Sequence, residues 1–123
     1  MSALQKFFHS VGHSINGLRH VAATEANMRW HLLATVAVVV CGSFFRISMI
    51  EWSLVIGCIG AVLALECINT SIERLADRVT TDHDPLIGQS KDVAAAAVLI
   101  MSLAAAIIGL IVFLPKVWAM FNS

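Results

Sequence analysis

Residues 93–114, VAAAAVLIMSLAAAIIGLIVFL, form an uninterrupted apolar stretch that decides the fold class of this 123-residue chain. The stretch contains no ionisable side chain and exceeds the ~20 residues that a helix needs to cross about 30 Å of hydrocarbon. Hydrophobic residues make up 59% of the chain and charged residues only 13%, a balance that disfavours a soluble globule. We therefore expect an integral membrane protein. The formal net charge is zero, so no global field favours nucleic acid as a partner.

Two further stretches are apolar enough to cross the bilayer. Residues 32–45 carry no charge, and the segment extends to Ile50 if Arg46 reaches the interface along its own side chain. The other runs from about Trp52 to Ile72. Helices satisfy their own backbone hydrogen bonds in lipid. We expect a single all-α domain over 1–123, with transmembrane spans at about 30–50, 52–73 and 93–115.

The amino-terminal segment, about residues 4–28, has a different pattern. Its apolar side chains recur at helical spacing, at Leu4, Phe7, Phe8, Val11, Ile15 and Leu18. This pattern predicts an amphipathic helix that lies on the membrane surface. A cleavable signal peptide needs an uninterrupted apolar centre, which this segment lacks, so we expect it to remain in the mature chain.

The basic residues predict the orientation. Six of them precede the first span or lie between the second and third: Lys6, Arg19, Arg29, Arg74, Arg78 and Lys91. Only Arg46 and Lys116 lie at the other boundary, and Glu51 is the one acid there. By the positive-inside rule, the amino terminus and the 74–91 segment are cytoplasmic and the carboxy terminus is outside. Nearly all reactive groups then lie where cytosolic nucleotide and Mg²⁺ are available.

A polar stripe descends from the second span into the charged segment after it. Glu66, Asn69, Glu73 and Asp77 follow one another at offsets of 3, 7 and 11 residues from the first, which puts them on one helical face. Acids at a bilayer edge are costly and usually face a cavity, a metal or water. The stripe is therefore the first candidate for chemistry.

The segment after the stripe contains Pro85 and Gly88, which suit a turn between helices. Lys91 and Asp92 then open the last helix, whose start is a plausible place for phosphate. Carboxylates, an amide and a lysine at a membrane boundary suit phosphoryl transfer, in which acids hold Mg²⁺ and one accepts the proton of an attacking hydroxyl. The usual phosphate-binding loop is absent, since Gly17 is followed by leucine.

The pattern E-x-x-N-x-x-x-E-x-x-x-D over residues 66–77, followed by K-D at 91–92, resembles the prokaryotic integral membrane diacylglycerol kinase family. The resemblance extends over nearly the whole chain, including Gly17-Leu-Arg19, Glu25 and Asn27-Met-Arg29. It implies a homotrimer of three-span subunits in the bacterial cytoplasmic membrane. Such a protein transfers the γ-phosphate of MgATP to a lipid hydroxyl, in active sites between neighbouring subunits.

The same resemblance implies roles for individual residues. Glu66 would be the general base toward the lipid hydroxyl, Asn69 would orient the phosphate or the base, and Glu25 with Glu73 would be the Mg²⁺ ligands. The residues on the nucleotide side, apart from Glu25 and Glu73, would be Gly12, Ser14, Gly17, Asp77, Lys91 and Asp92.

The acceptor is less well defined. Residues 27–31, 50–52, 91–95 and 109–116 are more similar to undecaprenol kinases than to diacylglycerol kinases, so undecaprenol is slightly preferred and diacylglycerol is the alternative. Two other functions are open from the residues alone: a small oligomeric transporter and a non-catalytic assembly subunit. A transport pathway distributes polar groups through the depth of the bilayer, whereas here the acids gather at one boundary.

Each site residue also has a structural interpretation. Glu25 and Asp92 could be helix-terminal charges, and Lys91 could be an interfacial anchor. Asn69 could join helices through its amide. Asp77 could pair with an arginine of its own helix.

Overall fold

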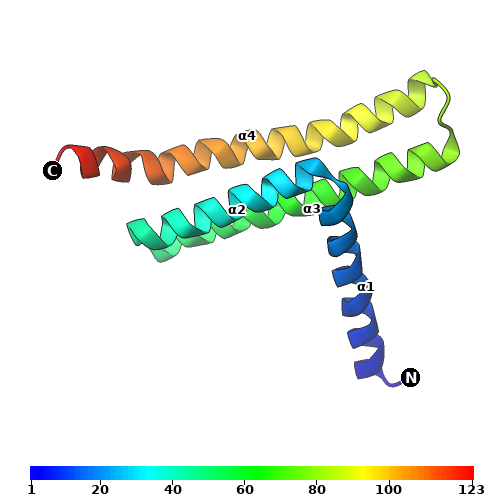
Figure 1. The fold of residues 1–123 in the computed structure, drawn as a ribbon, viewed down its shortest axis with the longest axis horizontal. Helices are drawn as coiled ribbons and strands as arrows, with labels where there is room; N and C mark the ends of the chain where they lie inside the picture. Colours follow the sequence, from blue (N-terminus) through cyan, green and yellow to red (C-terminus); the bar gives the residue numbers. More distant parts are fainter.

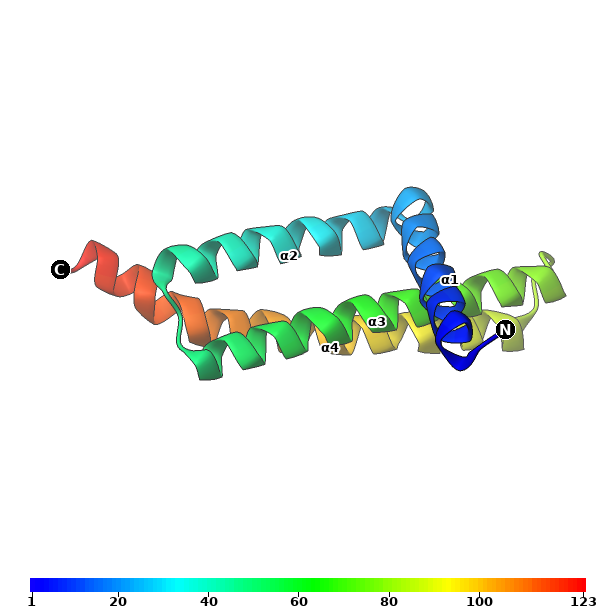
Figure 2. The ribbon, with the colours of Figure 1, turned by 90° about the horizontal axis from the view of Figure 1, so that it is seen from below.

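The computed structural model describes residues 1–123 as four helices: α1 (Ala3–Thr24), α2 (Ala26–Phe45), α3 (Met49–Val79) and α4 (Pro85–Phe121). The expected all-α class is confirmed. Helices α2, α3 and α4 run side by side along the long axis of the molecule, and α1 projects from them at a wide angle (Figure 1). Seen after a quarter turn, α3 and α4 continue beyond the level of α1, while the carboxy terminus lies at the opposite end (Figure 2).

The helix starts are fixed by side-chain caps. Ser2 and Ser48 each form a capping box, with Gln5 and Glu51 as the reciprocal partners. The Asp84 carboxylate accepts hydrogen bonds from the backbone N–H groups of Leu86 and Ile87, and proline occupies the first position of α4. Because these caps satisfy N–H groups that have no partner within a helix, they define where α1, α3 and α4 begin.

The surface helix expected over about 4–28 is shorter than predicted, because the chain bends at Glu25. This residue is extended, with φ −107° and ψ 116°, and separates α1 from α2. The Arg29 guanidinium donates hydrogen bonds to the backbone carbonyls of Ala22 and Ala23, the latter at 2.9 Å. The last turn of α1 is thereby capped from α2, which stabilises the bend. We call residues 24–26 the elbow.

Helices α2 and α3 are joined by a tight turn at the other end of the molecule. Arg46 ends α2 in the left-handed conformation, with φ 51°, and the Ile47 N–H donates to the carbonyl of Gly42. A small apolar core of Ile47, Val55 and Val112 lies here, with other apolar side chains packed against it. This core fixes the spacing of the three long helices at the end away from the polar stripe.

All three long helices are apolar enough to cross a membrane. Helix α3 extends to Val79 and α4 begins at Pro85, so both continue well past the limits expected for their spans, 73 and 93. Only 13 of 123 residues are buried, and large apolar side chains are exposed along every helix. Because a soluble monomer rarely exposes such surface, the molecule is a membrane protein whose apolar faces require lipid or other subunits.

Candidate functional site

The polar stripe lies on one face of α3, and its exposure increases along the helix. The residue exposure of Glu66 is 2% and that of Asn69 is 6%, whereas the Asp77 side chain is 56% exposed. Glu73 lies between these extremes. The helix therefore carries one row of polar groups from the apolar interior to the open end of the molecule.

Two stripe residues are joined to each other. The Asn69 Nδ2 donates a hydrogen bond of 3.3 Å to Oε1 of Glu73, one turn further along α3. The Asn69 Oδ1 and the Oγ1 of the neighbouring Thr70 are buried and lack partners. Buried polar atoms normally have partners, so these two are exceptions within the single chain.

Glu66 is nearly enclosed. Its side chain is 3% exposed, and its Oε2 is buried with no hydrogen-bond partner. The ring of His31, from α2, is the nearest basic group, with Nε2 3.6 Å from Oε2. The Glu66 carboxylate is therefore shielded from bulk solvent.

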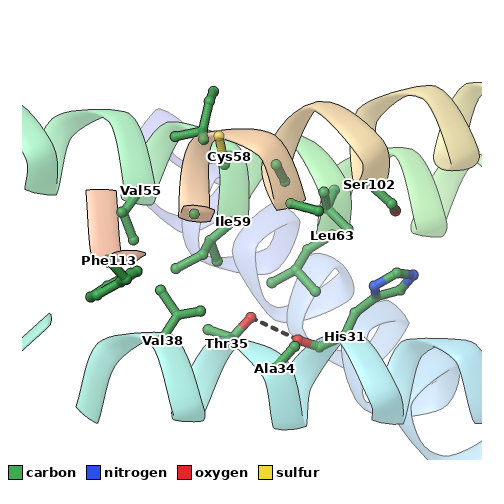
Figure 3. Close-up of a pocket in the computed structure, with 15 residues that line it drawn as sticks. His31, Ala34, Thr35, Val38, Val55, Cys58, Ile59, Leu63, Ser102 and Phe113 are labelled. Carbon is green, nitrogen blue, oxygen red and sulfur yellow. Dashed lines mark hydrogen bonds between the residues drawn. The ribbon is translucent and has the colours of Figure 1, made fainter. Parts of the chain in front are cut away.

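An apolar cavity of about 280 Å³ runs from His31 between α2, α3 and α4. In Figure 3, His31 stands at one end and Phe113 at the other, with Val38, Ile59 and Leu63 along the walls. Ser102 is one of few polar lining residues, and its Oγ has no partner. The cavity therefore offers an apolar space that begins beside the stripe and is suited to hydrocarbon.

Glu25 is held at the elbow by Arg74 of α3. The guanidinium lies 2.9 Å from Oε1 of Glu25 and also donates to the Thr24 hydroxyl. Since Arg74 follows Glu73 directly in sequence, this pairing brings Glu25 and the stripe to the same end of the molecule. It also ties the base of α1 to α3.

At the outer edge of the site, Lys91 of α4 pairs with Asp77 of α3. Their Nζ and Oδ1 atoms are 2.7 Å apart, and both side chains are at least one-third exposed. The alternative pairing of Asp77 with an arginine of its own helix is not observed. Asp92 is exposed and forms no side-chain hydrogen bond.

The three expected residues of α1 are not joined to these groups within one chain. Nothing lies within 4 Å of a Cβ placed on Gly12 or Gly17, and the Ser14 hydroxyl donates only to the carbonyl of Ser10. They lie on the arm that projects from the bundle (Figure 1).

Two contacting residues had not been assigned a role from the sequence: His31 and Arg74. His31 meets Glu66 from another helix, and Arg74 meets Glu25 across 49 residues of sequence. Spacing within one helix carries no information about such pairs.

The donor set is suited to Mg²⁺. No group of three or more histidines, cysteines and acids gathers to hold a metal. Magnesium bound with nucleotide typically takes only one or two carboxylates, and phosphate oxygens and waters complete its shell. Glu25 and Glu73 supply two such carboxylates, and the unpartnered Oδ1 of Asn69 is a further hard oxygen donor beside Glu73.

Fold and site together define a small helical membrane protein in which one helix, α3, carries a buried carboxylate, Glu66, and a buried amide, Asn69. The family model described as prokaryotic diacylglycerol kinase matches residues 12–113. The chain is 42% identical over 113 residues to the undecaprenol kinase of Bacillus subtilis (strain 168), covering 92% of each chain. It is 30% identical over 117 residues to the diacylglycerol kinase of Escherichia coli (strain K12), covering 95% of this chain and 93% of that one.

The chain therefore belongs to the prokaryotic diacylglycerol kinase family, and it is a lipid kinase. This membership confirms the family expected from the 66–77 and 91–92 patterns, and it excludes the transporter and assembly-subunit alternatives.

Proposed function

We propose that this protein transfers the γ-phosphate of MgATP to the hydroxyl of a membrane lipid alcohol, with undecaprenol preferred over diacylglycerol. The observation that carries the proposal is the buried, unpartnered Glu66 carboxylate beside an apolar cavity. A lipid alcohol needs both features at once, an acceptor for its proton and an apolar path for its chain. The 42% identity to a relative named undecaprenol kinase supports the preferred acceptor.

The transfer is a direct displacement. The lipid hydroxyl gives its proton to Glu66 as its oxygen bonds to the γ-phosphorus, the bond from this phosphorus to the β,γ-bridging oxygen breaks, and ADP leaves. Asn69 orients the γ-phosphate or the general base, and its amide Nδ2, which donates to Glu73 here, has a second N–H that can donate to a phosphate oxygen. Lys91 offsets negative charge on the phosphates once it leaves Asp77.

Glu25 and Glu73 would hold Mg²⁺, which when bound neutralises charge on the phosphate oxygens. Arg74 competes for Glu25 in the free enzyme, so nucleotide binding exchanges one ion pair for another. Asp77 and Asp92 line the nucleotide side beside Lys91. The nucleotide-side residues also include Gly12, Ser14 and Gly17 of α1. Their small size leaves room for the nucleotide to approach the helix closely.

We further propose a homotrimer with each active site between two subunits. No other helix lies within 4 Å of a Cβ placed on Gly12 or Gly17, the Ser14 hydroxyl binds only within α1, and most apolar surface is exposed. A neighbouring subunit can supply contacts for these α1 residues and also cover the exposed apolar surface. The distribution of basic residues supports a cytoplasmic site, with the amino terminus inside and the carboxy terminus outside, in a bacterial cytoplasmic membrane.

The test is a comparison of acceptors. Purified protein in mixed micelles is given MgATP with undecaprenol or diacylglycerol, and kcat/KM is measured for each lipid. We expect phosphorylation of both, with undecaprenol favoured. A strong preference for diacylglycerol would reverse the acceptor assignment, and phosphorylation of neither lipid would overturn the proposed reaction.

A further inference from the structure

The Glu66 carboxylate has an unusual electrostatic setting. The titratable groups that act on it are His31 of α2, Glu73 of α3 and Glu25 at the elbow. Two of these three are acids, which repel a second negative charge. His31 is the closest basic group, with its Nε2 3.6 Å from Oε2 of Glu66.

His31 is both close to Glu66 and part of the cavity lining. Its side chain is 23% exposed against 3% for Glu66, and its ring is part of the cavity lining. In Figure 3 the imidazole points from α2 into the space between the helices, away from the Thr35 hydroxyl that binds the His31 carbonyl. A lipid chain in the cavity would pass this ring before its hydroxyl reached Glu66.

We propose that His31 is a positioning residue for Glu66. An N–H on Nε2 orients the unpartnered Oε2 toward the cavity that His31 lines. This inference rests on the proposed function, because it assigns how the general base is held. It adds a residue from α2 to a site that otherwise consists of α1, α3, α4 and the elbow.

The separation of 3.6 Å is longer than a good hydrogen bond, so the contact must tighten when the lipid hydroxyl arrives. A hydrogen bond to a charged group corresponds to about 10-fold to 100-fold in an equilibrium or rate. We therefore expect His31→Leu to lower kcat by about that factor. The KM for ATP should change little, since the ring does not contact the nucleotide-side residues.

A double-mutant cycle separates this role from simple packing. His31→Leu is measured alone and in the Glu66→Gln background, by radiolabel transfer from ATP to undecaprenol in mixed micelles. If His31 acts through the carboxylate, the loss from His31→Leu largely disappears once the carboxylate is an amide. His31→Gln, which keeps an N–H donor, should restore most of the activity lost in His31→Leu.

His83→Leu is the matched control, because it removes an exposed loop histidine far along the chain from Glu66. It should keep wild-type kcat. The positioning role is wrong if the two losses multiply in the double variant, if His31→Gln is as impaired as His31→Leu, or if His31→Leu stays within about two-fold of wild type. An inactive wild type would instead refute the proposed reaction, and the positioning role with it.

Discussion

Gly42 lies where α2 meets the start of α3, and a methyl group there would overfill the contact. A Cβ at this position would lie 2.7 Å from Cη2 of Trp52, 3.0 Å from its Cζ2 and 3.1 Å from Cδ1 of Ile47. Carbon atoms prefer about 3.5–4.0 Å, so the indole must move. Trp52 packs against the small core that sets the spacing of the three long helices, and overpacking such a core costs about 1–3 kcal/mol.

Gly57→Ala provides the reference, because nothing lies within 4 Å of a Cβ at that position. Both substitutions gain the same helix propensity, about 0.8–1.0 kcal/mol, so this term cancels in their difference. We expect Gly42→Ala to unfold more easily than Gly57→Ala by about 1–3 kcal/mol. The assay is denaturant unfolding in detergent micelles followed by far-ultraviolet circular dichroism. Equal unfolding free energies, within about 0.5 kcal/mol, would refute the tight contact.

Three further substitutions test the polar groups. Asn69→Leu removes the hydrogen bond to Glu73 and should lower kcat by about 10-fold to 100-fold in the lipid kinase assay, since the acceptor is a charged group. Lys91→Met frees Asp77 and should raise the KM for ATP more than it lowers kcat, which steady-state kinetics with varied ATP would measure. Lys116→Met breaks an ion pair at the opposite end of the bundle, so it should leave both kinetic constants unchanged while lowering thermal stability in micelles.

The polar stripe shows what the sequence can predict. The spacing of Glu66, Asn69, Glu73 and Asp77 requires one helical face, and the transition from apolar to charged residues requires a gradient of burial. Both are local consequences of a helix that leaves an apolar environment. The structure has the row on α3 with exposure that increases toward Asp77.

The elbow shows what the sequence does not reveal. The apolar repeat from Leu4 to Leu18 gives no signal for a bend, and the surface helix was predicted to continue to about residue 28. At the bend, Arg29 of α2 donates to the carbonyl of Ala23 in α1, and Arg74 of α3 pairs with Glu25. Long-range pairs of this kind, including His31 with Glu66, follow from how helices pack and not from spacing within one helix.

Helix ends also differ from membrane boundaries. Hydropathy indicates which residues can lie in the hydrocarbon region of the membrane. It predicted an end near residue 73 for the second span and a start near residue 93 for the third. The backbone stays helical beyond them because Asp84 caps α4 at Pro85 and α3 continues in a polar environment to Val79. These extensions include Asp77 and Lys91. The joined ends of α3 and α4 continue past the level of α1 (Figure 2).

The central claim is that the buried Glu66 and the partly buried Glu73 promote direct transfer of phosphate from MgATP to a lipid alcohol. Its most direct test is the rate of ATP-dependent phosphate incorporation into lipid by wild type, Glu66→Gln, Glu73→Gln and the exposed-loop control Asp82→Asn. Loss of a general base lowers rates by about 10²-fold to 10⁴-fold. We predict a loss of this size for Glu66→Gln, a severe loss for Glu73→Gln that excess Mg²⁺ partly relieves, and wild-type rates for Asp82→Asn. Full activity in both glutamate variants would contradict the account.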